Sequence, residues 1–485
     1  MSELAKEPDL KSGVAFRRAV WVRVPVPPPY LFKGGFFVMM NILTLNCGSS
    51  SVKYQLYDWD AKRVVANGIV ERVTIGGSFI VHKLPSGEEY KITEECPTHK
   101  EAISLILKIL THSEYGVLKD VSEIKAVGHR VVHGGEKFAK SVIIDDEALA
   151  TFEELSELAP LHNPPNIMGI RAAKEVLPDV PHVAVMDTAW HQTIPDFAYI
   201  YALPYEWYER YGIRRYGFHG TSLLYVSKRA SVILGKDPLE TNLVLAHIGN
   251  GVSFNAVKDG VSVDTSMGFT PLEGAVMGTR AGDHDAAIDL YMMEKLNIGT
   301  AEMNTILNKK SGILGITGKY TDRRDVEVAF RNGDDRARLA IEIESYRGRK
   351  YIGAYMAAIG RVDAIVFTAG VGEMSSLIRK KMLEGLEHFG VRLDDRKNEL
   401  SKTRNAETEI SAEDSEVRVF VIPTDEELVI TEDTIALIEG RYDIHTRFRY
   451  SFQEPGYTNY LREKLFAEEL KRKPELLDIR VKIPA

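Results

Sequence analysis

The sequence predicts an α/β fold made of two duplicated domains with a cleft between them. Apolar, β-branched runs alternate with helical patterns through the middle of the chain, as in layered α/β proteins. Segments 42–60 and 243–260 also share one plan: an apolar strand, a polar turn containing Gly, and an alternating strand that leads to Asp. Two such hairpins about two hundred residues apart indicate a duplication with a nucleotide held between the halves.

The composition limits the classes of function. The chain has 485 residues, of which 44% are hydrophobic and 27% charged, and so it can form two or three domains. A net charge of -8 and a pI near 6.0 argue against a nucleic-acid-binding protein. Its two cysteines, Cys47 and Cys96, predict neither a disulfide framework nor a metal cluster, and they fit a reducing cytoplasm.

Both ends of the chain differ from its middle. Residues 1–39 contain a Pro-rich stretch without a signal-peptide core, and we expect an extension outside the main fold, with Met40 resembling a natural first residue. Residues 441–485 form a charged, aromatic C-terminal extension with one amphipathic helix expected around 458–472. No run approaches the roughly 20 apolar residues of a membrane span, and so we expect no membrane partner.

Between these ends lie several apolar, β-branched runs, and each of them ends in small, polar or charged residues. A long helical pattern covers 337–358. Since ligands of open α/β sheets bind beyond the carboxyl ends of strands, the residues that end these runs are candidates for a site. The predicted strand segments are 126–135, 182–191, 242–260, 363–373 and 417–427.

The first hairpin turn has more polar groups than a simple turn needs. Cys47 is followed by Gly48, three serines and, two residues later, Lys53. Free amides of a Gly turn, hydroxyls and one Lys suit a phosphate, although an ordinary polar loop would look similar.

Eight short motifs follow one another along the chain: NCGSSSVK, GHRVVHGG, LAPLHNPPN, RRYGFHGTS, AHIGNGVS, DTSMGFTPLEGAVMGTRAGD, FTAGVGE and IPTDEEL. Their order resembles that of the acetate kinases. The resemblance covers Met40 to Gly440. It implies reversible phosphoryl transfer between ATP and acetate, giving acetyl phosphate and ADP by direct in-line transfer, in a homodimer whose chains have two actin-like (ribonuclease H-like) domains. The first domain would span 40–190, completed by about 422–440, and the second, nucleotide-binding and dimerisation domain would span 191–421.

Transfer to a carboxylate brings two anions together, and therefore the site needs fixed positive charge. Arg130 and Arg280 follow strands or turns among small residues, where a planar guanidinium could bind oxygens at two points. The resemblance implies that Arg130 orients the acetyl group, Arg280 stabilises the transferred oxygens and His219 donates a hydrogen bond to them. It adds Asp187 to the catalytic set and His162 as transition-state support. The apolar acyl pocket would comprise Val132, Leu161, Phe218 and Pro271.

Carboxylates at strand ends are candidates for holding Mg²⁺, which prefers oxygen ligands. Asp187 and Glu426 have such positions, and each could instead be a helix cap. The resemblance implies a Mg²⁺ site, with Mn²⁺ as a substitute, at Asn46 and Glu426, and Glu427 remains an alternative to Glu426. His247, to which no chemical step is assigned, is grouped with the nucleotide side. The implied nucleotide-binding residues are Ser49, Ser51, Lys53, His247, Asn250, Gly251, Asp322, Arg324, Gly370 and Gly372.

Several positions depart from the family pattern, and they put nucleotide affinity and base preference in doubt. They are Leu223, Ala281, Ala286, Arg323 and Met374. Two other functions stay open. A propionate or butyrate kinase would share nearly every motif, whereas a chaperone-like or filament-forming actin-like ATPase would share the hairpins but would have no use for Arg130, His219 and Arg280.

Overall fold

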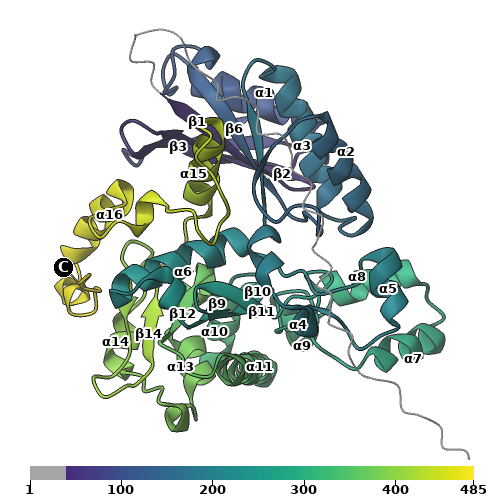
Figure 1. Cartoon of the computed structure of the whole chain (residues 1–485), viewed down its shortest axis with the longest axis vertical. Coiled ribbons are helices and arrows are strands. Elements are labelled where there is room, and N and C mark those ends of the chain that lie inside the picture. The colour runs from purple at the N-terminus through teal and green to yellow at the C-terminus, as the bar shows by residue number, and fades with distance from the viewer. Residues whose placement is uncertain (1–39, 485) are drawn as a thin grey trace, which may run out of the picture.

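The computed structural model describes residues 40–484, which form two β-sheets, one in each half of the molecule (Figure 1). The predicted extension 1–39 lies outside the described residues. The sheets have eight and six strands, with the orders β5-β4-β3-β2-β1-β6-β8-β7 and β11-β10-β9-β12-β14-β13. Within the described chain, no helix has the length and apolar character needed to cross a bilayer.

The first sheet lies between helices of the same half and α15 (Glu426–Ile438), which returns to it from the second half (Figure 1). Its central strand β1 is buried along almost its whole length, as expected for a strand covered on both faces. The strands are β1 (Asn41–Cys47), β2 (Ser51–Asp58), β3 (Arg63–Glu71), β4 (Phe79–Lys83), β5 (Glu89–Thr93), β6 (Ile124–Val131), β7 (Val142–Ile143) and β8 (His182–Met186). The helices are α1 (His99–Leu110), α2 (Asp146–Glu154) and α3 (Asn163–Val176), with the 3-10 turns η1 (Val121–Glu123) and η2 (Leu155–Glu157).

The second sheet is covered by the long helix α11 (Asp335–Ile359) and by α6 (Gly220–Leu234), which pack against β10 and β9 respectively. The helical pattern predicted for 337–358 is therefore confirmed. The strands are β9 (Leu243–Ile248), β10 (Val252–Lys258), β11 (Val261–Thr265), β12 (Ala364–Thr368), β13 (Thr408–Glu409) and β14 (Arg418–Val421). The other helices are α10 (Arg323–Arg331), α12 (Ala369–Met374), α13 (Ser376–Leu383) and α14 (Asp395–Leu400), with the 3-10 turns η4 (Pro238–Glu240) and η5 (Glu387–Phe389).

Five strands of each sheet repeat one topology. In the first sheet, β3-β2-β1 are antiparallel, and β6 and β8 then continue parallel to β1. In the second, β11-β10-β9 are antiparallel, and β12 and β14 continue parallel to β9. The predicted α/β class and the duplicated actin-like plan are thus confirmed.

Four of the five predicted strand segments contain a strand that ends earlier than the sequence indicated, at Val131, Met186, Thr368 and Val421. The segment 363–373 divides into β12 and α12, because the chain turns at Ala369, whose φ is +64°. The segment 182–191 divides into β8 and the 3-10 turn η3 (Ala189–Thr193). Both strands therefore stop where candidate site residues begin.

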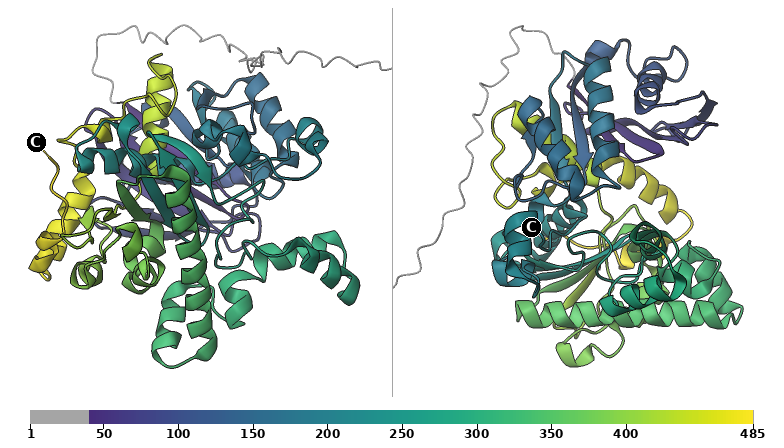
Figure 2. Two further views of the ribbon diagram at one scale, coloured as in Figure 1. Left: turned by 60° about the horizontal axis from the view of Figure 1, so that its bottom comes forward. Right: turned by 90° about the vertical axis from the view of Figure 1, so that its right-hand side faces the viewer.

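An arm of short helices extends from the second half, as Figures 1 and 2 show. It consists of α5 (Tyr205–Tyr211), α7 (Ala286–Leu296) and α8 (Thr300–Lys309). At its base lie α4 (Asp196–Tyr199), beside β11, and α9 (Gly312–Thr317), which packs against α11. Neither α5 nor α7 has a buried residue. The exposed apolar side chains of this arm and its base are Phe197, Leu203, Tyr205, Trp207, Tyr211, Ile288, Leu290, Tyr291 and Leu296.

The C-terminal segment, residues 441–484, packs into the body of the protein. Tyr450 and Phe452 are fully buried in one cluster with residues of α6 and α15. The helix predicted at 458–472 is confirmed as α16 (Tyr460–Leu470), which lies where the two halves meet (Figure 1). Two 3-10 turns, η6 (Ser451–Gln453) and η7 (Pro474–Asp478), complete the segment.

Candidate active site

The first hairpin presents one polar face at its turn. Asn46 and Lys53 are cross-strand partners, and therefore their side chains share a face of the sheet. Ser51 lies two residues before Lys53 on the same strand and points to the same side. Ser49 lies in the turn and is exposed. These four residues, which the sequence predicted to act together, lie within eight consecutive residues, 46–53, around one hairpin turn.

The second hairpin supports His219. On its strands, His247 and Ser253 are cross-strand partners. The His219 ring stacks on the His247 ring with centroids 4.0 Å apart, and its Nδ1 lies 2.9 Å from the Ser253 hydroxyl. His247 in turn contacts the Ser222 hydroxyl at 2.8 Å. His247 thus contacts His219 directly, and nothing in this geometry tests its grouping with the nucleotide side.

The backbone at His219 is unusual for a residue with a side chain. Its φ is +58°, in the left-handed region, immediately before α6 begins. The next residue, Gly220, donates its N–H to the Asp187 carbonyl at 2.9 Å, and a Cβ atom there would lie 2.2 Å from that oxygen. The lack of a Cβ atom at Gly220 therefore allows this close backbone approach.

Arg130 and two carboxylates form the charged centre of the first half. Arg130 donates two hydrogen bonds to Asp187, at 2.9 Å from Nε and 2.7 Å from Nη2, and its Nη1 lies 3.8 Å from Glu426. Although burial alone would lower the pKa of Arg130, these carboxylates raise it above its ordinary value. The Asp187 side chain is 2% exposed, and therefore the pair is largely shielded from solvent.

Glu426 is the better placed of the two alternative carboxylates. Besides Arg130, it accepts a hydrogen bond of 3.5 Å from Thr221 of α6. Burial raises the pKa of Glu426 to about 7, with Arg130 and Lys53 opposing the rise. Burial also raises the pKa of Glu427. Contacts from both halves therefore converge on Glu426.

Arg280 approaches the same place from the second half. A Cβ atom on Gly251, in the turn of the second hairpin, would lie 3.1 Å from the His219 ring and 3.6 Å from the Arg280 guanidinium. Arg280 donates a hydrogen bond of 3.0 Å to the Pro271 carbonyl, and burial lowers its pKa. Burial, His247, Arg130 and Arg280 together hold the pKa of His219 well below its usual range, and so the ring is neutral at pH 7.

His162 lies near these cations as well. Burial, followed by the charge of Arg280, lowers the pKa of His162 to about 4. The two asparagines that follow it were missed by the sequence interpretation, although the HNPPN motif contains both. Asn166 accepts from the Val132 N–H at 3.0 Å and donates to the Cys47 carbonyl at 2.7 Å, and it thereby connects the ends of β6 and β1. The sequence interpretation also missed Ser253, because its role depends on the contact with His219, which lies 34 residues earlier in the chain.

The expected apolar pocket is only partly assembled. Phe218 is buried, and Val132 packs against the same cluster. Pro271 approaches the site through its carbonyl, which accepts from Arg280. Leu161 is 47% exposed, whereas Phe218 is 2% exposed.

The expected nucleotide residues fall into two groups. The exposed Asn250 accepts a hydrogen bond of 3.0 Å from Gly278, and a Cβ atom on Gly278 would lie 1.9 Å from the Asn250 amide oxygen. Gly372 approaches β9, since a Cβ atom there would lie 3.5 Å from the Ala246 carbonyl. Gly370 precedes it in α12, the helix that begins where β12 ends.

Asp322 and Arg324 instead pair with each other at the surface. Asp322 caps α10, and its carboxylate lies 2.5 Å from Arg324, whose side chain is 90% exposed. Arg324 holds the pKa of Asp322 at about 2. The neighbouring Arg323 points inward and pairs with the buried Glu344 at 2.9 Å. Among the positions that depart from the family pattern, Leu223 is buried in the core and Met374 is exposed.

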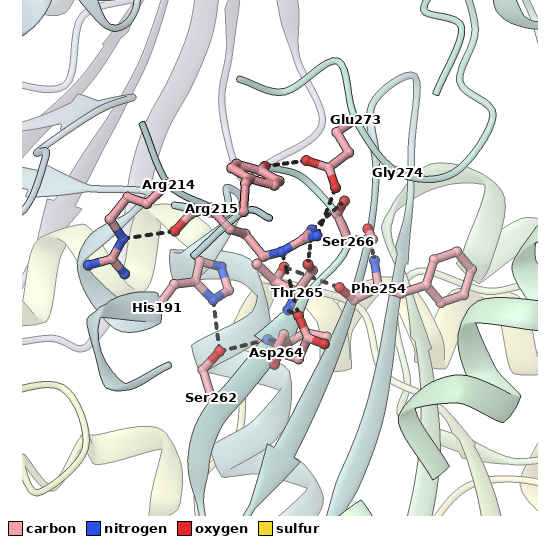
Figure 3. Close-up of polar contacts among 12 residues, drawn as sticks. His191, Arg214, Arg215, Phe254, Ser262, Asp264, Thr265, Ser266, Glu273 and Gly274 are labelled. Carbon is pink, nitrogen blue, oxygen red and sulfur yellow. Dashed lines mark hydrogen bonds and ion pairs between the residues drawn. The ribbon is translucent and has the colours of Figure 1, made fainter. Parts of the chain in front are cut away.

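Figure 3 shows how the chain is held after it leaves the first half. His191, four residues beyond Asp187, is fully buried and lies 2.9 Å from the Ser262 hydroxyl of β11. Its other ring nitrogen donates to the Phe218 carbonyl at 3.1 Å. Close by, Arg215 binds the Thr265 carbonyl and Glu273. This first crossover is therefore anchored in the second half.

Within the part of the chain that the structure describes, no ready-made metal cluster accompanies these groups. Among residues 40–484, no three His, Cys, Asp or Glu side chains are arranged to hold an ion. Mg²⁺ needs only one or two protein carboxylates beside water and phosphate oxygens. The oxygen donors of Glu426 and Asn46 fit that requirement.

Comparison with known proteins identifies the family. The model of the acetokinase family matches residues 41–432. The chain belongs to this family. An acetate kinase from Geobacter metallireducens is 62% identical over 418 residues, which are 86% of this chain and 99% of that protein.

Solved structures of the acetokinase family agree. The crystal structure of Porphyromonas gingivalis acetate kinase is 46% identical, with a TM-score of 0.79, covering 82% of this chain and 100% of that one. A propionate kinase from Francisella tularensis is 42% identical, with a TM-score of 0.77, covering 82% and 99%. This acetokinase-family chain is therefore a kinase, as the sequence predicted.

Proposed function

We propose that this kinase transfers the γ-phosphoryl group of ATP to acetate and catalyses the reverse reaction. In the forward direction an acetate oxygen bonds to the γ-phosphorus, the bond from that phosphorus to the bridging oxygen of ATP breaks, and ADP leaves. The convergence of Arg130, His219 and Arg280 from two halves of the chain carries this proposal. An actin-like ATPase without an acyl acceptor would not need that group.

Each residue has a role that follows from its surroundings. Arg130, held by Asp187, would keep one guanidinium edge toward the acetate carboxylate. The neutral His219 would donate a hydrogen bond from Nε2 to the transferred group, because Ser253 and His247 fix its ring. Arg280 would stabilise the charge on the equatorial oxygens in the transition state. His162 would support the same group of oxygens.

The remaining predicted contacts belong to the substrates and the metal. Val132 and Phe218 would contact the acetate methyl group. Glu426 and Asn46 would hold Mg²⁺, or Mn²⁺ in its place, which neutralises phosphate charge when bound. The hairpin turns would bind the phosphates of the nucleotide. The rim of the second half would bind its adenosine. Those residues are Ser49, Ser51, Lys53, Asn250, Gly251, Asp322, Arg324, Gly370 and Gly372.

We also propose the predicted division into a first domain of 40–190 with 422–440 and a second of 191–421. The packing of α15 on β1, β6 and β8 supports it. The exposed apolar side chains of α5 and α7 support a homodimer through the arm, since such patches mark protein interfaces. Dependence on ATP supports a cytoplasmic location. Light scattering of the full chain tests the dimer, and a monomeric mass would contradict it.

The reaction is tested by trapping the acyl phosphate with hydroxylamine. Purified protein with ATP and Mg²⁺ should form acetyl hydroxamate, and kcat/KM for acetate should exceed the values for propionate and butyrate. A higher value for propionate would favour the activity named for the Francisella relative. ATP hydrolysis without any hydroxamate would overturn the proposal. One methylene changes transition-state binding by about 1 to 3 kcal/mol, and so the preference should be 10- to 200-fold.

A further inference from the structure

The chain passes between its halves twice, and the two crossovers are held differently. The first, after Asp187, is anchored by the buried His191 within the second half. The second, residues 423–425, connects β14 to α15 and leads directly to Glu426. Thr424 of this crossover donates its N–H to Glu373 of α12 at 3.4 Å. The other contacts from outside α15 come from the C-terminal segment, residues 441–484, which lies beyond the part of the chain that the family model matches.

Two helix caps are joined at the second crossover. Asp425 caps α15 by accepting from the Leu428 N–H at 3.1 Å, and Asn459 caps α16 by accepting from the Arg462 N–H at 3.1 Å. The Asn459 amide also donates to the second carboxylate oxygen of Asp425 at 3.0 Å. The starts of α15 and α16 are thereby connected side chain to side chain.

Arg462 holds the backbone of the same crossover. Its guanidinium donates to the Pro423 carbonyl at 2.8 Å and to the Thr424 carbonyl at 2.5 Å, and it lies 3.8 Å from the Asp425 carboxylate. The Arg462 side chain is 20% exposed. A charged donor at a mostly shielded position makes strong hydrogen bonds to carbonyls.

The other side of the crossover leaves room for movement. A cavity of about 590 Å³ lies between the C-terminal segment and the first sheet, with Asp425, Leu428 and Asn459 on one side and Tyr57 and Val64 on the other. Packing from that side is therefore incomplete. The position of residues 423–425 consequently depends more strongly on the contacts with Arg462 and Asn459.

The C-terminal segment is itself anchored to both halves. Ser451 binds Glu432 of α15 through its N–H at 2.8 Å, and Tyr450 donates to Asp433 at 2.8 Å. In the second half, Glu469 of α16 accepts from Asn405 at 2.7 Å, and Arg229 of α6 donates to the Phe452 carbonyl at 2.6 Å. The support for Arg462 is therefore rigid on both sides of the crossover.

We propose that Arg462, assisted by Asn459, is a positioning residue that holds the second crossover so that Glu426 is presented to the site. The segment 441–484 is then a strap across the two halves that serves the reaction without touching substrate. The proposal rests on the proposed function only in giving Glu426 a part in that reaction. The position of the crossover can be tested without substrate.

The test compares Arg462→Ala and Arg462→Lys with Arg449→Ala. Arg449 is a matched control in the same segment, since its ion pair with Glu454 is exposed at both partners. In ligand-free protein, Arg462→Ala should speed amide hydrogen exchange in residues 425–430 by at least about tenfold, the effect of losing one hydrogen bond to a charged donor. Exchange in α6 should stay unchanged, and Arg462→Lys should be intermediate.

In the full reaction, Arg462→Ala should lower kcat about tenfold and raise the apparent KM for Mg²⁺, whereas the KM for acetate should change less than twofold. Exchange and kcat equal to those of Arg449→Ala would overturn the proposal. If Arg462→Ala does not fold, the same comparison with Arg462→Lys decides. If the wild-type chain makes no acyl phosphate, the proposed function fails. The positioning role of Arg462 is refuted separately, if Arg462→Ala leaves amide exchange at residues 425–430 unchanged.

Discussion

Removing Arg130 should cost far more stability than removing an ordinary surface arginine or lysine. Arg130→Ala leaves the Asp187 carboxylate, 2% exposed, without its two charged hydrogen bonds. Two unit charges about 4 Å apart at an effective dielectric constant of about 20 attract by about 4 kcal/mol. Breaking a buried pair from one side typically costs about 3 to 5 kcal/mol. Because the Arg130 side chain is 20% exposed, we expect a loss of about 3 kcal/mol.

The assay is urea unfolding followed by two spectroscopic probes that must give one coincident transition. Lys137→Ala is the control, since its pair with Glu154 is exposed at both partners and should be worth less than about 1 kcal/mol. The double variant Arg130→Ala/Asp187→Ala should lose less than the sum of the two single variants, because no unpaired charge remains. A loss equal to that of Lys137→Ala, or strictly additive losses, would refute this reasoning.

Three further predictions concern chemistry and titration. Arg280→Ala should lower kcat by about 10² to 10³ with little change in the KM for acetate in the hydroxamate assay, because its contact strengthens in the transition state; near-normal kcat would contradict its role. Burial raises the pKa of Asp433 to about 7, and so the stability from its proton is complete below about pH 4 and is lost as the pH rises through 7. In urea unfolding, the free energy of unfolding of Asp433→Asn relative to wild type should therefore rise by on the order of 2 kcal/mol between pH 5 and pH 8. A difference that does not change with pH would argue against this reasoning. Burial raises the pKa of Cys47 to about 12 and that of Cys96 to about 11. Both thiols should therefore react with a disulfide reagent at pH 8 only after the chain unfolds. Rapid labelling of the folded chain would contradict this prediction.

Local patterns in the sequence were sufficient for the fold and the family. Alternation along 51–58 and 252–258 specifies strands, and the Gly-containing turns before them specify hairpins, because both depend on neighbouring residues only. Repetition of that plan indicated the duplication before any contact between the halves was known. The ordered motifs indicated the family for the same reason, since each is a short continuous stretch.

The arrangement of the site was decided by tertiary structure. Arg130 and Asp187 are 57 residues apart, and their pairing depends on β6 and β8 lying side by side in register. The stacking of His219 on His247 depends on a left-handed backbone that sequence alone does not reveal. The C-terminal segment was expected only as an extension, yet Arg462 reaches carbonyls almost forty residues earlier in the chain. Such contacts are determined by how finished helices and sheets pack, and packing depends on the whole surface of each element rather than on any short run of residues.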